Sequence, residues 1–202
     1  MTVIEVVEQQ PEITQRQRWS HYFALLYGLL AIIIGINLRD SAINSTVPYT
    51  NLQVGIRAQY PRGWVIDDEG NYVFRVRDMS QTGFKTTIQV SVITVTAGTS
   101  ARNILDSLIL NRQQLLAYYR VLSRFPTTLT RPQEDIDATV MTYTFVSGED
   151  NPFLESLPVV VEGQDVLILQ RGQAIVISFL SDRDTYEQNL PIFERFLNDI
   201  QF

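Results

Sequence analysis

One uninterrupted apolar segment near the beginning of the chain dominates its hydrophobic pattern. Residues 22–38 read YFALLYGLLAIIIGINL and carry no formal charge, and His21 extends the uncharged stretch by one residue. A helix needs about 17–25 predominantly apolar residues to cross a bilayer core. A core helix of a water-soluble domain would show a polar face here, which this segment lacks. The pattern therefore predicts a transmembrane helix over residues 21–38.

The residues that border this segment are typical of a membrane span. Arg16, Arg18 and Trp19 precede it, and Arg39 follows it; basic and aromatic residues are enriched at membrane–water interfaces. A cleaved signal peptide would occupy the same position in the chain. However, the segment is longer than an ordinary signal-peptide core, and residues 44–46 (NST) are a poor cleavage site. We therefore favour an uncleaved anchor.

Beyond the apolar segment, hydrophobic and polar residues alternate as they do in half-buried β-strands. Residues 52–56 alternate in this way and predict a first strand. Residues 64–66 and 72–76 flank a polar stretch and predict a hairpin. Residues 87–95 alternate strongly and predict a further strand.

Two helices and four more strands complete the predicted domain. Apolar residues recur at helical spacing up to Tyr119, after a helix start at which Thr99 or Ser100 is the N-cap. A last helix carries its apolar residues between Leu190 and Ile200, and we expect Pro191 in its first turn. The remaining strands are predicted at residues 120–131, 138–147, 166–169 and 174–180.

The last two of these strands determine the fold class. Residues 166–169 and 175–177 are apolar at consecutive positions, so both faces of this hairpin need cover. The two helices of the domain can supply it, one on each face. The sequence therefore predicts an α+β fold: an antiparallel sheet of about seven strands with helices on both faces, an α/β/α sandwich, preceded by one transmembrane helix.

Two short motifs in the predicted domain are characteristic of a known family. Residues 60–64 read YPRGW and precede a hairpin, and residues 172–178 read GQAIVIS and precede a helix that closes in IQF. In both respects residues 50–202 resemble PsbP-like domains, the superfamily of the extrinsic photosystem II subunit. The resemblance implies an α/β/α sandwich, usually outside the cytoplasm, with a binding or assembly role and no catalysis. Bacterial relatives often carry a lipid-bearing Cys, where this chain has a helix, and no metal ligands of the family have a counterpart here.

These expectations divide the chain into four parts and place it in a membrane. The parts are a polar tail at 1–20, the transmembrane helix at 21–38, a tether at 39–50 and a PsbP-like globular domain at 51–202. Two arginines precede the span (Arg16, Arg18) and two follow it (Arg39, Arg57), but only the first two are clustered. This slightly favours the N-terminus inside. We expect a single-pass protein of the inner (cytoplasmic) membrane with an extracytoplasmic domain.

Composition excludes several kinds of chemistry. The chain has no Cys and one His, so it has no disulfide, no thiol nucleophile and no His-based metal cage. The one His, His21, lies at the edge of the predicted span, which argues against an ordinary Ser–His–acid triad in the domain. Its net charge of −6 argues against nucleic acid as a partner. No nucleotide-binding, zinc-hydrolase or nucleophile-elbow motif occurs. We expect neither enzymatic activity nor a cofactor.

Carboxylates gather at two places in the sequence. Residues 67–71 (DDEGN) are the densest run, but their spacing departs from that of an EF-hand loop. A solvated hairpin turn is favoured there over a cation site. Glu149, Asp150 and Glu155 lie in a predicted loop, and no aromatic pattern supports a glycosidase-type pair.

The predicted span carries the candidate site. Its small residues are spaced four, three and four apart and form one continuous stripe: Ala24, Gly28, Ala31 and Gly35. Such stripes allow a second helix to approach closely inside a membrane. Glycine and alanine are also frequent in spans that have no partner, and this alternative stays open.

Together these features predict a non-catalytic accessory subunit of a membrane complex. The expected partners are other membrane-protein subunits, contacted through the span and the domain, and the lipid bilayer. Family analogy points to bacterial photosynthetic or respiratory electron transport. The alternative is a free-standing, membrane-anchored module that binds a small molecule or a lipid.

Overall fold

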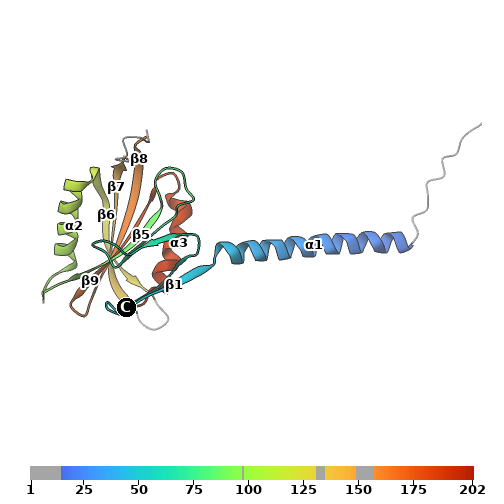
Figure 1. The fold of residues 1–202 in the computed structure, drawn as a ribbon, viewed down its shortest axis with the longest axis horizontal. Helices are drawn as coiled ribbons and strands as arrows, with labels where there is room; N and C mark the ends of the chain where they lie inside the picture. Colours follow the sequence, from blue (N-terminus) through green and yellow to red (C-terminus); the bar gives the residue numbers. More distant parts are fainter. Residues whose placement is uncertain (1–14, 97, 131–134, 149–156) are drawn as a thin grey trace, which may run out of the picture. The chain divides into compact units, whose positions relative to one another are not determined.

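The computed structural model describes residues 15–96, 98–130, 135–148 and 157–202. The chain divides into two compact units, one ending at Ser45 and the other spanning Thr46–Phe202 (Figure 1). The described residues of the first unit form one helix, α1 (Gln15–Ile43), which extends beyond the predicted span in both directions. No proline lies between Gln15 and Pro48, so the helix continues into the expected tether.

The second unit is built on one antiparallel sheet of seven strands, in the order β3-β4-β5-β9-β8-β7-β6. The strands are β3 (Val65–Asp67), β4 (Phe74–Arg77), β5 (Thr87–Thr94), β6 (Ala117–Leu129), β7 (Ile136–Ser147), β8 (Val159–Gln170) and β9 (Gln173–Asp182). The predicted hairpins β3–β4 and β8–β9 are confirmed. Arg171 and Gly172 join β8 to β9 with φ angles of 50° and 75°. Positive φ at both positions is typical of a two-residue hairpin turn.

A two-stranded ribbon precedes this sheet, and the sequence did not predict it. β1 (Thr46–Asn51) pairs with β2 (Ile56–Pro61), so most of the expected tether at 39–50 is helix or strand. Several ribbon residues pack into the core on one side of the large sheet, where Ile56 is fully buried. The ribbon is therefore part of the globular unit.

The strand predicted at residues 52–56 is wrong for most of its length, because a turn lies there. The side chain of Asn51 accepts hydrogen bonds from the backbone N–H groups of Gln53 and Val54, at 3.0 and 3.3 Å. Gly55 has a φ of 73°, and Leu52 is 84% exposed. An Asn side chain that bonds to the backbone two residues ahead favours a turn over a strand.

Helices cover both faces of the large sheet, as predicted. α2 (Ala101–Leu115) lies on one side and α3 (Tyr186–Asp199) on the other (Figure 1). Alternate residues of β9 serve the two cores: Ile175 and Ile177 pack on the α3 side, and Ala174 and Val176 on the α2 side. The consecutive apolar residues of this strand are thus explained by a sheet that is buried on both faces.

The helix ends differ from the predicted ones. Ser100 is the N-cap of α2 and accepts a hydrogen bond from the backbone N–H of Asn103 at 3.3 Å, as predicted. The helix ends at Leu115, however, and Tyr119 belongs to β6. Tyr119 still packs against the α2-side core, which is why its spacing resembled a helical repeat. α3 begins at Tyr186, so Pro191 lies in its second turn and not in its first.

Candidate functional site

The predicted docking stripe lies along α1, which is a regular helix over its whole length. Ala24, Gly28, Ala31 and Gly35 are all exposed. A Cβ atom added at Gly28 or Gly35 would meet no heavy atom within 4 Å. The stripe is therefore accessible to another helix, and its use as a docking face remains a prediction.

The same helix has the length and composition of a membrane span. The candidate span Trp19–Ala42 has 24 residues and a mean hydropathy of 1.8, and none of its most apolar window is buried within the chain. At 1.5 Å per residue it is about 36 Å long, enough to cross a hydrocarbon core of about 30 Å. Its one side-chain amide, on Asn37, donates to the carbonyl of Ile33 at 2.8 Å. An anchor and a signal sequence share these properties.

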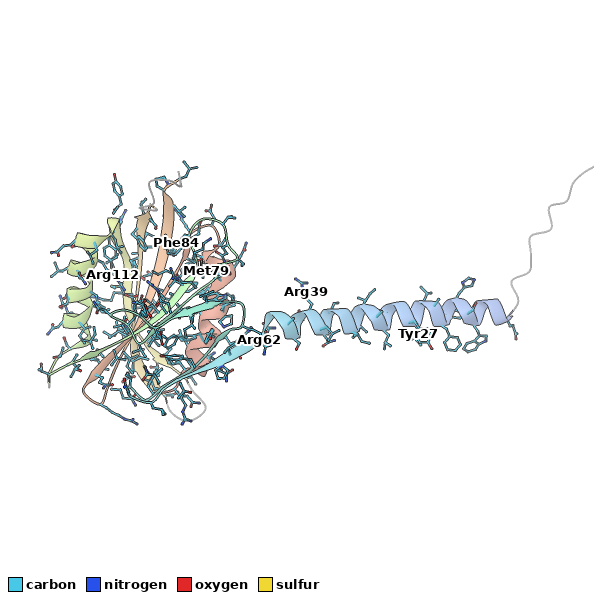
Figure 2. The ribbon with its side chains drawn as sticks, viewed as in Figure 1. Tyr27, Arg39, Arg62, Met79, Phe84 and Arg112 are labelled. Atoms are coloured by element: carbon cyan, nitrogen blue, oxygen red, sulfur yellow. The ribbon has the colours of Figure 1, made fainter. Side chains whose placement is uncertain are left out.

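In the globular unit, one buried ion pair joins α2 to the sheet. Arg112 lies in the last turn of α2 (Figure 2). It donates to both carboxylate oxygens of Asp165 on β8, one of them at 3.1 Å. The Asp165 side chain is fully buried, and that of Arg112 is 17% exposed. The Tyr143 hydroxyl donates to the same carboxylate at 3.2 Å. Asp165 is therefore satisfied by two neighbours, as a buried charge must be.

A glycine makes room for this cluster. The guanidinium of Arg112 lies 4.5 Å from the ring centroid of Tyr143, within cation–π range. Gly163 stands opposite Tyr143 in the β7–β8 register. A Cβ atom at Gly163 would lie 2.5 Å from the Tyr143 ring, closer than real Cβ contacts. The absence of a side chain at Gly163 allows the tyrosine to lie flat beneath Arg112.

The electrostatics fix the protonation of two of these groups. Burial is the largest single influence on the pKa of Arg112 and lowers it, but the charge of Asp165, the hydrogen bond to it and the neighbouring tyrosines together outweigh burial and raise this pKa. Burial raises the pKa of Tyr143 well above its usual value, and the Asp165 charge raises it further. At neutral pH the arginine is charged and the tyrosine is protonated, so both act as fixed hydrogen-bond donors.

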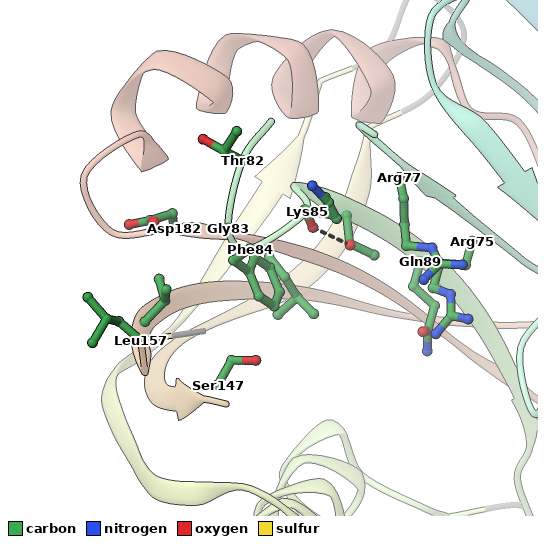
Figure 3. A pocket seen from close by; sticks show the side chains of 13 residues that line it. Arg75, Arg77, Thr82, Gly83, Phe84, Lys85, Gln89, Ser147, Leu157 and Asp182 are labelled. Carbon is green, nitrogen blue, oxygen red and sulfur yellow. Dashed lines mark hydrogen bonds between the residues drawn. The ribbon is translucent and has the colours of Figure 1, made fainter. Parts of the chain in front are cut away.

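Two adjoining cavities on this side of the sheet lie next to the Arg112 cluster. One, of about 630 Å³, lies beside α2 and is lined by Arg112, Tyr143 and Ser178 together with apolar residues of the helix. The other, of about 740 Å³, is lined by Arg77, Phe84 and Lys85 (Figure 3). Arg75, Gln89 and Leu180 line both, so the cavities adjoin. Arg75, Gln89, Ser178 and Asp165 follow one another in register across β4, β5, β9 and β8.

The acidic run at residues 67–71 lies in the β3–β4 hairpin, as predicted. Asp67 accepts hydrogen bonds from Arg75 at 2.5 Å and from the Tyr72 hydroxyl at 2.8 Å. The hydrogen bond from Arg75, then those from Tyr72 and the backbone N–H of Glu69, lower the pKa of Asp67 to about 2. Within the described part of the chain, no three side chains of metal-binding type come together.

Other residues that the sequence singled out have structural positions. Tyr60 and Trp64 of the YPRGW motif are buried in the α3-side core. Glu149, Asp150 and Glu155 lie outside the described residues. The Arg112–Asp165 pair was not predicted, because its members are 53 residues apart in the sequence. The one available signal was a charged residue directly before the apolar run that begins at Val166.

Known structures identify the fold. The chain is similar to the solution structure of cyanobacterial PsbP (CyanoP) from Synechocystis sp. PCC 6803, with 14% sequence identity and a TM-score of 0.57. The match covers 79% of this chain and 93% of that protein. The globular unit thus has the PsbP-like fold, and the resemblance seen in its sequence motifs is confirmed at the level of fold.

Two further matches are more distant. The Ran-binding protein Mog1p of Saccharomyces cerevisiae has 10% identity and a TM-score of 0.48, with 78% of this chain and 95% of that chain covered. A Pseudomonas aeruginosa protein of unknown function, described as a putative regulator, has 10% identity and a TM-score of 0.44, with 75% and 93% covered. No family model matches the sequence, and no curated protein matches it.

Proposed function

We propose that this chain is a non-catalytic accessory subunit of a multi-subunit membrane complex. The proposal starts from a PsbP-like domain that follows an apolar helix of membrane-spanning length. In this proposal α1 is an uncleaved anchor with its N-terminus inside, and the domain lies on the extracytoplasmic side of the cytoplasmic membrane. The complex belongs to bacterial photosynthetic or respiratory electron transport, by analogy with the photosystem subunit that gives PsbP-like domains their name.

The observation that carries the proposal is the unburied apolar surface of α1. Leu25, Tyr27 and Leu38 are each 67–71% exposed, and the most apolar window of the helix buries nothing within the chain. Such a surface requires lipid or a partner protein to cover it. The exposed stripe through Gly28 and Gly35 supports a partner helix in addition to lipid, because small residues allow close helix packing.

The domain supports a binding role more than a catalytic one. Arg112 and Asp165 neutralise one another, and Tyr143 stays protonated, so these groups hold fixed roles at neutral pH. A free-standing, anchored binding module is the second candidate, and the two cavities on the α2 side favour it. The two candidates differ in whether other proteins accompany the chain.

Purification of the tagged full chain from its native membranes in a mild detergent separates the two candidates. We expect a reproducible set of other membrane proteins in constant ratio to the chain. The control is a chain of the same length in which an unrelated span replaces residues 19–42; it should retain fewer of these proteins. Elution of the native chain alone would contradict the subunit proposal and leave the binding module.

A further inference from the structure

The larger of the two cavities has the size of a small-molecule site. Its volume of about 740 Å³ falls within the range of about 300–1,000 Å³ typical of ligand pockets. Figure 3 shows Arg75, Arg77 and Gln89 along one side and Phe84 near the centre. The subunit proposal gives none of these residues a role, whereas the second candidate, the binding module, draws on this cavity.

The charged residues of this cavity are mainly cationic. Arg75, Arg77 and Lys85 line it, and Asp182 is the one acidic residue among the described residues of its lining. Asp67 on the neighbouring strand β3 pairs with both arginines: its Oδ2 atom lies 2.5 Å from Arg75 and 3.7 Å from Arg77. One carboxylate does not use all the hydrogen-bond donors of two guanidinium groups. The Nε atoms of both arginines are buried without a hydrogen-bond partner. This local excess of positive charge contrasts with the net charge of −6 of the chain.

The rest of the cavity is apolar. Phe84 is half-buried, and its ring lies edge-on to that of Phe145 with centroids 6.3 Å apart, which holds it in place. Leu180 and Val159 extend the apolar wall. The cavity thus joins an apolar wall to a pair of guanidinium groups, and guanidinium groups bind carboxylate and phosphate in bidentate geometry.

We propose that this cavity binds an amphipathic organic anion. Its carboxylate or phosphate group lies against Arg75 and Arg77, and its hydrocarbon part lies against Phe84 and Leu180. Two kinds of molecule combine such an anionic group with a hydrocarbon part: an ionised membrane lipid and a water-soluble amphiphile. The site does not depend on whether the chain is a subunit of a complex.

The test uses the full chain in phosphatidylcholine nanodiscs, with octyl phosphate titrated by calorimetry against empty nanodiscs. We expect saturable binding of octyl phosphate, and binding at least about tenfold weaker for inorganic phosphate and for octanol, which each lack one half of the ligand. Equal affinity for inorganic phosphate would contradict the apolar contact, and equal affinity for octanol would contradict the anionic contact.

Variants locate the binding in this cavity. Arg77→Gln should weaken octyl phosphate binding about tenfold, because a hydrogen bond to a charged group is lost. Phe84→Ala should weaken octyl phosphate binding but leave that of inorganic phosphate unchanged. Arg62→Gln, at an exposed arginine outside the cavity, is the control and should bind like the parent chain. Unchanged binding in a folded Arg77→Gln chain, or no binding in the parent, would overturn the proposal.

A last arm identifies the source of the ligand. Phosphatidic acid is included in the same nanodiscs while octyl phosphate is titrated. If phosphatidic acid competes with octyl phosphate in the parent chain, and this competition is lost in Arg77→Gln, the result supports the proposal with a membrane lipid as the occupant. Unchanged octyl phosphate affinity supports it with a water-soluble amphiphile.

Discussion

At the scale of single residues, the α2 side of the sheet is organised around one buried carboxylate. Asp165 has no exposed side-chain surface, and Arg112 and Tyr143 supply its hydrogen bonds. Removing one partner of a buried ion pair leaves an uncompensated charge, which costs more than the pair itself contributes. This pair therefore determines how α2 attaches to β8.

Arg112→Met should lower the free energy of unfolding by about 3–5 kcal/mol, because Asp165 then stays buried without its cation. Urea unfolding of the full chain in detergent, followed by near-ultraviolet circular dichroism, measures the loss. Arg102→Met is the matched control on the same helix: the Arg102 side chain is 78% exposed and its Nε lies 3.8 Å from Asp106, so the loss of unfolding free energy should stay under about 1 kcal/mol. Equal losses of unfolding free energy in the two variants would show that the buried pair matters no more to stability than the exposed one.

Gly163→Ala should destabilise the domain by about 1–3 kcal/mol, the usual range for overpacking a core. The new methyl group would overlap the Tyr143 ring, which must then move away from Arg112. Gly63→Ala is the control, since a Cβ atom there meets nothing within 4 Å. The same unfolding measurement applies. A Gly163→Ala chain as stable as Gly63→Ala would contradict the close approach of ring and backbone.

Acid should weaken the domain through Asp67, whose pKa is lowered from 3.8 to about 2 in the folded chain. A group with a depressed folded pKa stabilises the fold above its unfolded pKa and loses that contribution as the pH falls. The loss should therefore occur between about pH 4 and pH 2. Asp67→Asn should flatten the stability curve in this window, while Asp68→Asn, at an exposed neighbour, should not. Parallel curves for Asp67→Asn and the parent would exclude this role.

At the scale of helices and strands, local patterns predicted most of the fold. Strands β4, β5 and β7–β9 alternate or are wholly apolar, and such patterns report directly on burial. The β1–β2 ribbon was missed because its pairing depends on a turn made by Asn51 and Gly55, not on periodicity. The end of α2 was missed because Tyr119 packs against the same core from a strand. The Arg112–Asp165 pair could not be predicted, because it depends on how two distant elements meet in space.

The stripe on α1 gives a prediction at the same scale. Gly28→Leu or Gly35→Leu should detach the chain from its complex, because a leucine side chain separates two helix backbones that would otherwise pack closely. Ile33→Leu, which conserves volume, should be tolerated. Co-purification of partner proteins with the three variants measures the effect. The globular unit should keep its fold in all three, since its core lies beyond Ser45.

Equal recovery of partners from the two glycine variants and from Ile33→Leu would mean that the stripe is the ordinary composition of a membrane span. In that case the domain alone would hold the complex. Near-ultraviolet circular dichroism of each variant provides the check on folding.

At the scale of the whole molecule, the chain combines an apolar helix with a PsbP-like domain. The sequence predicted both units, because hydropathy reports the helix and the YPRGW and GQAIVIS segments resemble the family of the fold. The extracytoplasmic position of the domain rests on a small asymmetry of arginines around the span. Among the central claims of the proposed function, this position of the domain is the one that can be tested most directly on the chain itself.

The absence of Cys permits that test in native membranes. Gln15→Cys lies at the start of α1, and Gln113→Cys lies at an exposed position of α2 in the domain. The measurement is labelling of each single-cysteine chain by a membrane-impermeant maleimide, before and after permeabilisation. We expect the cysteine at position 113 to react in cells whose outer layers have been removed and whose cytoplasmic membrane is intact. The cysteine at position 15 should react only after this membrane has been permeabilised. The reverse pattern would place the domain in the cytoplasm and contradict the proposed function.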